Sequence, residues 1–260
     1  MPAPRFTRRA ALTAGTAWAL TACSAQEAEK DDAAGGSPSA SGPSASESGS
    51  VDTSPASPAE SAPSSSRSNL DHASPDSLSV LVNKHYPLSP LDWAPNDLVD
   101  FGGVQLRAEV AQAAEQMFSA AAQQGLALTM LSGFRSYDYQ IQTYDNWVNT
   151  YGQEQADTAS ARPGYSEHQT GLAFDIGSAG GCNLQPCFAE TPEAQWTAEN
   201  CHKFGFVLRF PYWQHETTGY YFESWHFRYI GREQAQKYKD SAAENLESFW
   251  GFEAAADYQN

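Results

Sequence analysis

The ten residues SEHQTGLAFD, numbered 166–175, join an apolar run to two side chains that are able to bind a metal ion. Residues 172–174 (Leu-Ala-Phe) are typical of a buried strand, yet the run ends on the carboxylate of Asp175, seven residues after His168. A strand whose last residue reaches solvent would explain this pattern without a function. Alternatively, His168 and Asp175 hold a metal together, because imidazole and carboxylate are ordinary zinc ligands.

A third ligand is needed, because two side chains do not complete a zinc site. His226 is the best candidate, since it is a polar residue inside the aromatic segment YYFESWHFRY (220–229), and Glu223 precedes it by three positions. A hydrogen-bonded core histidine is the alternative. Strict alternation along a strand separates Glu223 from His226, so both reach one metal only if the strand ends, bends or bulges near residues 224–225.

The first 77 residues differ in composition from the rest of the chain. Residues 1–23 contain three arginines among the first nine positions, followed by an apolar run too short to span a bilayer. This pattern predicts a signal peptide. The run ends in Leu-Thr-Ala-Cys, which resembles a lipobox, so we expect Cys23 to be lipidated; an ordinary cleaved signal is the alternative. Residues 24–77 are rich in Ser, Pro, Ala and Gly, which predicts a disordered tether.

Residues 78–260 have the size and the aromatic content of one folded domain. Helices and short strands alternate along it without a glycine-rich phosphate loop, so we predict an α+β domain with a small, mostly antiparallel sheet flanked by helices. The formal net charge of −16 argues against nucleic-acid binding. We expect the protein to be a monomer. The periodicity predicts helices at 104–124, 137–151, 191–205 and 232–249, and strands at 78–82, 126–131, 206–209 and 220–229.

The cysteines of the domain are odd in number. Cys182 and Cys187 flank Asn-Leu-Gln-Pro, a turn-like stretch that could bring them within disulfide reach. Cys201 lies at helical spacing from apolar residues and is predicted to be buried and unpaired. The three cysteines lack the CxxC spacing of a structural zinc site.

Three segments together resemble the VanY-like zinc D-alanyl-D-alanine carboxypeptidases and dipeptidases of the vancomycin-resistance type. SEHQTGLAFD resembles the S-x-H-x-x-G-x-A-x-D motif of this family, and ESWHFR (223–228) resembles its E-x-W-H-x-R motif. SGFRSYDYQ (132–140) is similar to the S-G-[YF]-R-S-x-x-x-Q segment, and residues 81–99 also resemble the family. The resemblance covers roughly residues 78–250, with all motifs in order, and Cys201 beside the cysteine pair is the one departure.

The resemblance implies a role for each matching residue. His168, Asp175 and His226 would be the zinc ligands, and Glu223 would be the general base that takes a proton from water. Arg135 would face the oxygen that becomes negative during hydrolysis, or the terminal carboxylate of the substrate. The residues assigned to substrate binding are Ser166, Gln140 and Trp225. Arg228 is expected to brace its strand through an ion pair.

The implied activity is removal of the terminal D-Ala from peptidoglycan stem peptides ending in D-Ala-D-Ala. A D,D-dipeptidase or a peptidoglycan endopeptidase on the same scaffold is a second interpretation. A non-catalytic, zinc-containing wall-binding lipoprotein is a third, but a structural zinc site is usually closed by four protein ligands. A lipid anchor at Cys23 would hold the domain at the outer face of the bacterial cytoplasmic membrane, in the cell-wall space.

Overall fold

The computed structural model describes residues 70–259, so the predicted signal peptide, Cys23 and the tether as far as residue 69 lie outside the described residues. All strand pairs are antiparallel, and the main sheet has the order β3-β4-β6-β5. Its strands are β3 (Leu128–Ser132), β4 (Ala173–Ser178), β6 (Glu223–Tyr229) and β5 (Phe206–Phe210). A separate two-stranded sheet pairs β1 (Leu98–Phe101) with β2 (Val104–Arg107). The predicted α+β class with a small antiparallel sheet is confirmed.

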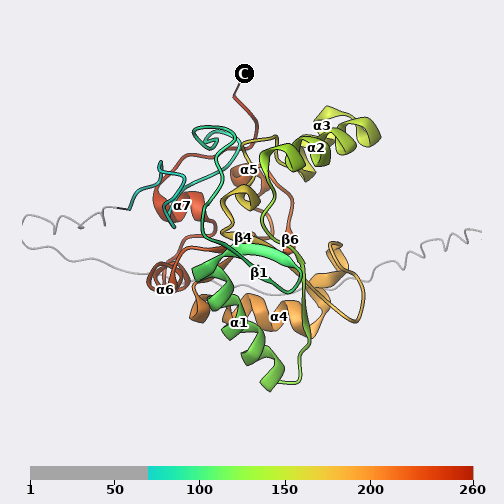
Figure 1. The fold of residues 1–260 in the computed structure, drawn as a ribbon, viewed down its shortest axis with the longest axis vertical. Coiled ribbons are helices and arrows are strands. Elements are labelled where there is room, and N and C mark those ends of the chain that lie inside the picture. The colour runs from blue at the N-terminus through green and yellow to red at the C-terminus, as the bar shows by residue number, and fades with distance from the viewer. Residues whose placement is uncertain (1–69, 260) are drawn as a thin grey trace, which may run out of the picture. The chain divides into compact units, whose positions relative to one another are not determined.

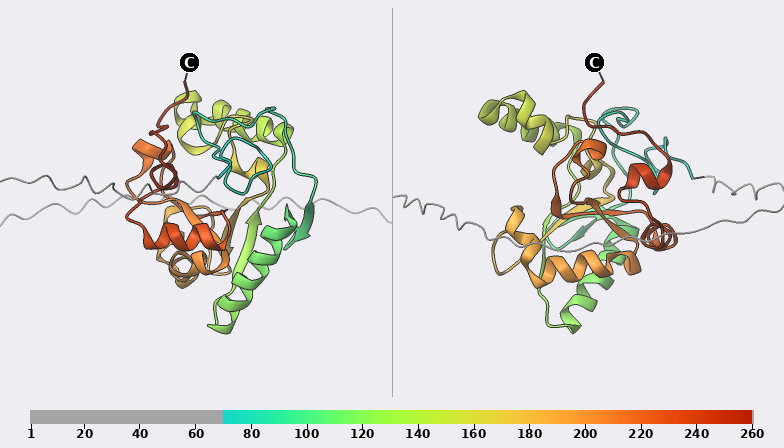
Figure 2. Two further views of the ribbon diagram at one scale, coloured as in Figure 1. Left: turned by 90° about the vertical axis from the view of Figure 1, so that its left-hand side faces the viewer. Right: turned by 180° about the vertical axis from the view of Figure 1, so that it is seen from behind.

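The helices lie on both sides of the main sheet (Figures 1 and 2). They are α1 (Ala108–Gln123), α2 (Tyr137–Tyr151), α3 (Gln153–Ala159), α4 (Pro192–Asn200), α5 (His215–Thr218), α6 (Arg232–Asp240) and α7 (Leu246–Trp250). Short 3-10 turns occur at η1 (Glu167–Thr170), η2 (Pro186–Glu190) and η3 (Cys201–Phe204). Helices α1 and α4 lie on one side of the sheet, and α2 and α3 lie on the other side (Figure 1). Among the described residues, no helix has both the length and the apolar character needed to cross a membrane.

The hydrophobic core lies between the sheet and the helices α1 and α4. Phe174 and Ile176 alternate with Asp175 along β4, and both belong to the main buried cluster together with Phe227 of β6. Side chains on a strand alternate between its two faces, so this register turns Asp175 to the face opposite the core. Met117 of α1 belongs to the same cluster and is fully buried. The core therefore fixes which polar residues of β4 face α2 and α3.

The helix predicted from residue 104 begins later than the periodicity indicates. Residues 104–107 form β2, which pairs with β1 across Gly102 and Gly103. Both glycines have positive φ, at +60° and +89°, as a two-residue type I′ hairpin turn requires. The helix α1 then starts at Ala108. The Gly-Gly turn was the sequence signal for a hairpin, and the apolar periodicity of residues 104–107 concealed it.

Other predicted boundaries also differ from the structure; for example, the strand predicted from residue 220 begins at Glu223. The predicted helix 232–249 is divided into α6 and α7, because the side chain of Asn245 accepts a hydrogen bond from the Ser248 amide and starts a new helix. Residues 78–82 form no strand, although Val80, Leu81 and Val82 are buried.

The folded part also begins before residue 78, within the segment assigned to the tether. The ring of His72 contacts Trp250, and Asp76 forms an ion pair with Arg107 at 3.2 Å. These contacts join segments that are distant in the sequence, so the composition of a serine-rich stretch does not reveal them.

Candidate active site

The two strand residues predicted as metal ligands face each other across the sheet. Asp175 of β4 and His226 of β6 are register partners, and directly opposite side chains of an antiparallel pair lie on the same face. His168 reaches the same point from η1, the short turn that precedes β4. One ligand atom from each of the three residues lies within 4.8 Å of the other two, and all three residues are buried. The structure therefore brings together the predicted ligand set.

The position of Glu223 depends on an irregularity in β6. Leu208 of β5 pairs with Phe227, but Phe210 pairs with Glu223, so the register shifts between these two pairs. This shift places Oε2 of Glu223 at 3.5 Å from Nδ1 of His226, although strict alternation would separate the two side chains. The irregularity lies around residues 224–225, where the hypothesis of a shared metal site predicted a bend or bulge.

The donor atoms of the site suit a zinc ion. Nδ1 of His168 lies 2.8 Å from the carbonyl oxygen of Gly133, which fixes that nitrogen as a hydrogen-bond donor and leaves the lone pair of Nε2 facing Asp175 at 3.4 Å. Oδ1 of Asp175 is buried without a hydrogen-bond partner and lies 3.4 Å from Nδ1 of His226. Two imidazoles and one carboxylate with converging lone pairs form the usual protein part of a catalytic zinc site.

The charges of these groups follow from their surroundings. Burial raises the pKa of Asp175, but His168 and His226 outweigh burial and hold it well below its ordinary value. Burial, helped by the charge of Arg135, lowers the pKa of His168 to about 4. Burial also lowers the pKa of His226, but the nearby carboxylates of Asp175 and Glu167 outweigh it and raise the pKa to about 9. A metal ion at this position would replace the proton on Nδ1 of His226.

Glu223 has the properties of a group that exchanges protons near neutral pH. Burial raises its pKa to about 7, and Asp175 acts in the same direction, while His226 and Arg135 act against it. General acid–base catalysis is most effective when the pKa of the catalytic group is close to the working pH.

Arg135 contributes a positive charge to the site. It forms no ion pair with a carboxylate in the described part of the chain. It lies in the loop between β3 and α2, where its backbone amide donates to the carbonyl oxygen of His168 at 3.2 Å. Its Nε is buried without a hydrogen-bond partner, and burial lowers its pKa. The half-buried guanidinium lines the pocket without a side-chain partner in the described part, so it is suited to bind a carboxylate or a developing oxyanion.

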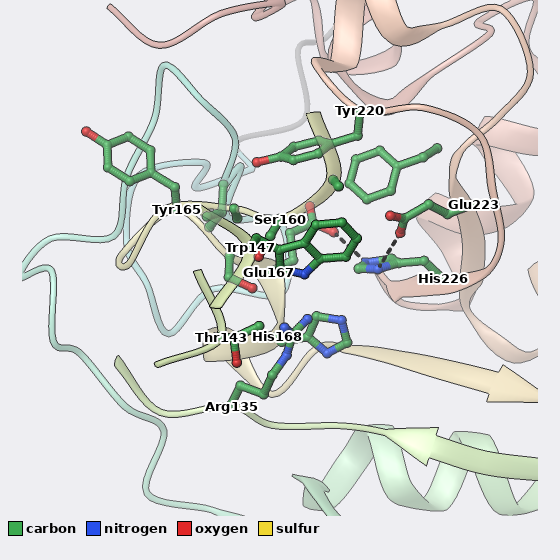
Figure 3. A pocket seen from close by; sticks show the side chains of 15 residues that line it. Arg135, Thr143, Trp147, Ser160, Tyr165, Glu167, His168, Tyr220, Glu223 and His226 are labelled. Carbon is green, nitrogen blue, oxygen red and sulfur yellow. Dashed lines mark ion pairs between the residues drawn. The ribbon is translucent and has the colours of Figure 1, made fainter. Parts of the chain in front are cut away.

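Two of the predicted ligands, together with Glu223 and Arg135, line one open pocket (Figure 3). His168, Glu223 and His226 line it from the side of the sheet, and Arg135 lines it from the loop after β3. The opposite wall comes from α2, α3 and the loop after them, through Thr143, Trp147, Ala159, Ser160, Ala161 and Tyr165.

The three residues assigned to substrate binding have different positions. Ser166 is buried and lines the cavity. Gln140 does not line it, because its Nε2 is turned inward and donates to the carbonyl oxygen of Ala161 at 2.7 Å and to Ser160 at 3.3 Å. Gln140 thus supports two residues of the cavity wall. Trp225 packs against the hydrophobic core, since it precedes His226 on the strand and points to the opposite face.

A buried network of charged residues behind His226 was not predicted from the sequence, apart from the ion pair of Arg228. Arg228 donates to Oε1 of Glu167 at 2.9 Å, as expected for a residue that braces its strand. Arg209 donates to the same oxygen at 2.8 Å and also pairs with Glu247 of α7. Glu167 lies within the SEHQTGLAFD segment, but nothing in the spacing indicated that its carboxylate is buried.

The cysteines form one disulfide in the described part. Cys182 and Cys187 are bonded to each other, and Cys201 is buried with a free thiol. Burial raises the pKa of the Cys201 thiol to about 12, so this sulfur is not a reactive group.

Comparisons with known proteins agree on one family. The family description "VanY: D-alanyl-D-alanine carboxypeptidase" matches residues 103–232. YodJ of Bacillus subtilis, which is provisionally named a carboxypeptidase, is 40% identical over 179 residues, covering 65% of this chain and 65% of that protein. The solved structure of the LdcB LD-carboxypeptidase is 38% identical, with a TM-score of 0.63, and the match covers 68% of this chain and 87% of that chain.

A variant of a vancomycin-resistance D,D-pentapeptidase VanY, solved in complex with Zn(II), is 30% identical with a TM-score of 0.58. This match covers 65% of this chain and 97% of that chain. The chain spans only 50% to 65% of the length of YodJ and of two D-alanyl-D-alanine carboxypeptidases from Enterococcus species.

Proposed function

Because the chain belongs to the VanY D-alanyl-D-alanine carboxypeptidase family, we propose that it is a zinc-dependent hydrolase that releases the terminal D-alanine of peptidoglycan stem peptides. One observation carries the proposal: Glu223 lies 3.5 Å from His226, beside three converging ligand atoms and in the same cavity as the unpaired Arg135. Metal ligands, a base and an anion-binding cation are the parts that metal-assisted hydrolysis of a terminal peptide bond requires.

Zinc, when bound by His168, Asp175 and His226, would supply Lewis-acid polarisation of the scissile carbonyl and would make water a better nucleophile near neutral pH. Glu223 would accept a proton from the attacking water at a carboxylate oxygen and later deliver it to the leaving amine of D-alanine. Its raised pKa suits both steps, since the group must be unprotonated first and protonated afterwards.

Arg135 would bind either the terminal carboxylate of the peptide or the oxyanion formed at the scissile carbonyl. Its planar guanidinium presents paired donors to either group, and burial strengthens the interaction because water competes less. Thr143, Trp147 and Tyr165 would enclose the peptide from the opposite wall of the cavity. In this arrangement, α2 and the loop after α3 determine which stem peptide fits.

Two stereochemical forms of this reaction are supported by different relatives. D,D-cleavage leaves a stem peptide that ends in D-Ala, and it is favoured by the family description and by the VanYB structure solved with D-alanine-D-alanine. L,D-cleavage acts on the bond between an L-centre and the last D-Ala. It is favoured by the LdcB and DacB structures, which are 38% identical to this chain, compared with 30% for the VanY structures. A D,D-dipeptidase or endopeptidase on the same scaffold differs only in how the cavity receives the peptide.

The N-terminal segments would place this activity at the cell wall. A lipidated Cys23 would anchor the protein at the outer face of the cytoplasmic membrane, and residues 24–69 would act as a tether. A flexible chain of about 50 residues reaches at most roughly 160 Å, so a tethered monomer would sample polymeric wall substrate close to the membrane.

The test is incubation of the zinc-loaded protein with two peptides, a pentapeptide ending in D-Ala-D-Ala and a tetrapeptide ending in a single D-Ala, with mass analysis of the products. Loss of one alanine from the pentapeptide alone indicates D,D-cleavage, and loss of one alanine from the tetrapeptide indicates L,D-cleavage. Release of the intact dipeptide D-Ala-D-Ala from the pentapeptide would instead indicate cleavage at the bond before the last two residues. If neither peptide is shortened, the proposed function is wrong.

A further inference from the structure

Glu167 lies beside His226 (Figure 3), at the ring nitrogen opposite the one that faces Asp175. Its Oε2 is 3.6 Å from Nε2 of His226, while Nδ1 of the same ring faces Asp175 at 3.4 Å. Both Oε2 of Glu167 and Nε2 of His226 are buried and lack a hydrogen-bond partner within bonding distance. The two unpartnered atoms face each other, and one is an acceptor while the other is able to carry a proton.

The carboxylate of Glu167 is held from its other oxygen. Oε1 accepts from Nε of Arg209 at 2.8 Å and from Nη1 of Arg228 at 2.9 Å. Arg228 also donates to the carbonyl oxygens of Leu78 and Val80, at 3.1 and 2.7 Å. These contacts leave only Oε2 free to accept a further hydrogen bond.

Arg209 is fixed in turn by Glu247 of α7. It donates to both oxygens of Glu247, at 3.0 and 2.6 Å, and Asn83 donates to Oε1 of Glu247 at 3.0 Å. Glu167, Arg209, Arg228 and Glu247 form a buried frame. Its two negative and two positive charges balance, so the frame is neutral without His226. The frame therefore fixes the direction of Oε2 without depending on a charge on the imidazole.

We propose that Glu167 is a positioning residue that holds His226 with its proton on Nε2 and the lone pair of Nδ1 directed at the metal. The proposal rests on the metal site of the proposed function. Metal-binding histidines are generally oriented by a carboxylate or carbonyl on their second nitrogen, and loss of such a partner weakens metal binding by about 10- to 100-fold.

The substitution Glu167→Gln tests this directly. Both arginines donate to Oε1, so the amide oxygen must remain there, and the amide NH2 group then occupies the position of Oε2. This NH2 group faces the Nε2–H of His226, and two donors cannot bond. The variant should therefore favour the tautomer with its proton on Nδ1, which cannot bind the metal.

Glu247→Gln is the matched control. It removes one negative charge from the same arginine and the same frame, but Glu247 has no contact with His226 among the hydrogen bonds and ion pairs of the described part. The measurement is the affinity of each full-length protein for Zn²⁺ alone, by competition with a chromophoric chelator, with thermal unfolding of each metal-free protein recorded in parallel. We expect Glu167→Gln to lose about 10- to 100-fold in zinc affinity. We expect Glu247→Gln to keep its affinity within about threefold, although both variants lose stability.

Equal zinc affinity in the wild type and in Glu167→Gln would overturn the inference and leave the proposed function intact. Equal losses in the two variants would also overturn it, because the effect would then belong to the frame as a whole. A wild-type protein that binds no zinc would overturn the proposed function as well. If Glu167→Gln does not fold, Glu167→Asp and Glu247→Asp replace the pair, since each keeps its charge but withdraws the carboxylate by one methylene. The same difference in zinc affinity is then expected.

Discussion

Replacing Glu223 by glutamine separates a catalyst from a metal-binding scaffold. The amide has nearly the same size as the carboxylate and can still hydrogen-bond to water, but it cannot accept a proton. General acid–base groups contribute about 10²- to 10⁴-fold in rate, which corresponds to about 3 to 5 kcal/mol of barrier. We therefore expect kcat for D-alanine release to fall by at least about 100-fold. KM should change little, because Arg135 and the cavity walls remain.

The same substitution should not damage the fold. The one charged partner of Glu223 within 4 Å in the described part is His226, at 3.5 Å. Burial raises the pKa of Glu223 from 4.5 to about 7, so the ionised carboxylate is disfavoured in the folded metal-free protein by about 3 kcal/mol. In the wild type, the free energy of unfolding therefore decreases as the pH rises above 4.5, and the full loss is reached above pH 7. The glutamine of Glu223→Gln does not ionise, so the variant does not lose this stability. Metal-free Glu223→Gln should thus be at least as stable as the wild type at pH 8.

The assay compares zinc content, thermal unfolding and D-alanine release for the two proteins side by side. Zinc retained at one equivalent with a large loss of kcat is the expected result. Loss of zinc together with activity would make Glu223 a ligand or a structural residue. Zinc retained with nearly normal activity would remove Glu223 from the mechanism altogether.

Three further outcomes are expected. Arg135→Lys should lower kcat and raise KM together, because an ammonium group cannot reproduce the planar pair of donors, and a change confined to one parameter in steady-state kinetics would limit Arg135 to one role. Peptide mapping without reductant should show Cys182 bonded to Cys187, and iodoacetamide should label Cys201 only after denaturation; a linkage that includes Cys201 would refute this arrangement. Cys23→Ser should release the protein from membranes in cell fractionation, and continued membrane association would mean another anchor.

The sequence was most informative where chemistry and periodicity coincide. The helix 137–151 was predicted with its observed bounds from its periodicity, and in the structure Ser136 caps its start and Gly152 follows its end. The convergence of His168, Asp175 and His226 could be anticipated from SEHQTGLAFD and from one polar residue in an aromatic strand. The need to place Glu223 beside His226 also predicted an irregular strand, and β6 has one.

The parts that could not be predicted depend on contacts between distant segments. Gln140 was assigned to substrate binding from its motif, but its amide is turned inward to the carbonyl of Ala161, 21 residues away. The frame around Glu167 joins residues 61 and 42 positions apart in the chain, and no local pattern reports such contacts. The walls of the cavity come from α2 and the loop after α3 for the same reason. Local sequence thus indicated the residues proposed to react, and the three-dimensional fold supplies the residues that surround them.

The dependence of D-alanine release on zinc is the most direct test of the central claim. The protein is stripped of metal with a chelator, dialysed, and titrated with Zn²⁺ while D-alanine release from the better of the two stem peptides is followed. Activity should be absent at the start, rise in proportion to added zinc, and stop rising at one equivalent per chain, as expected for a single site at His168, Asp175 and His226. Full activity in the stripped protein, or no activity at any zinc level in protein that binds zinc, would contradict the account.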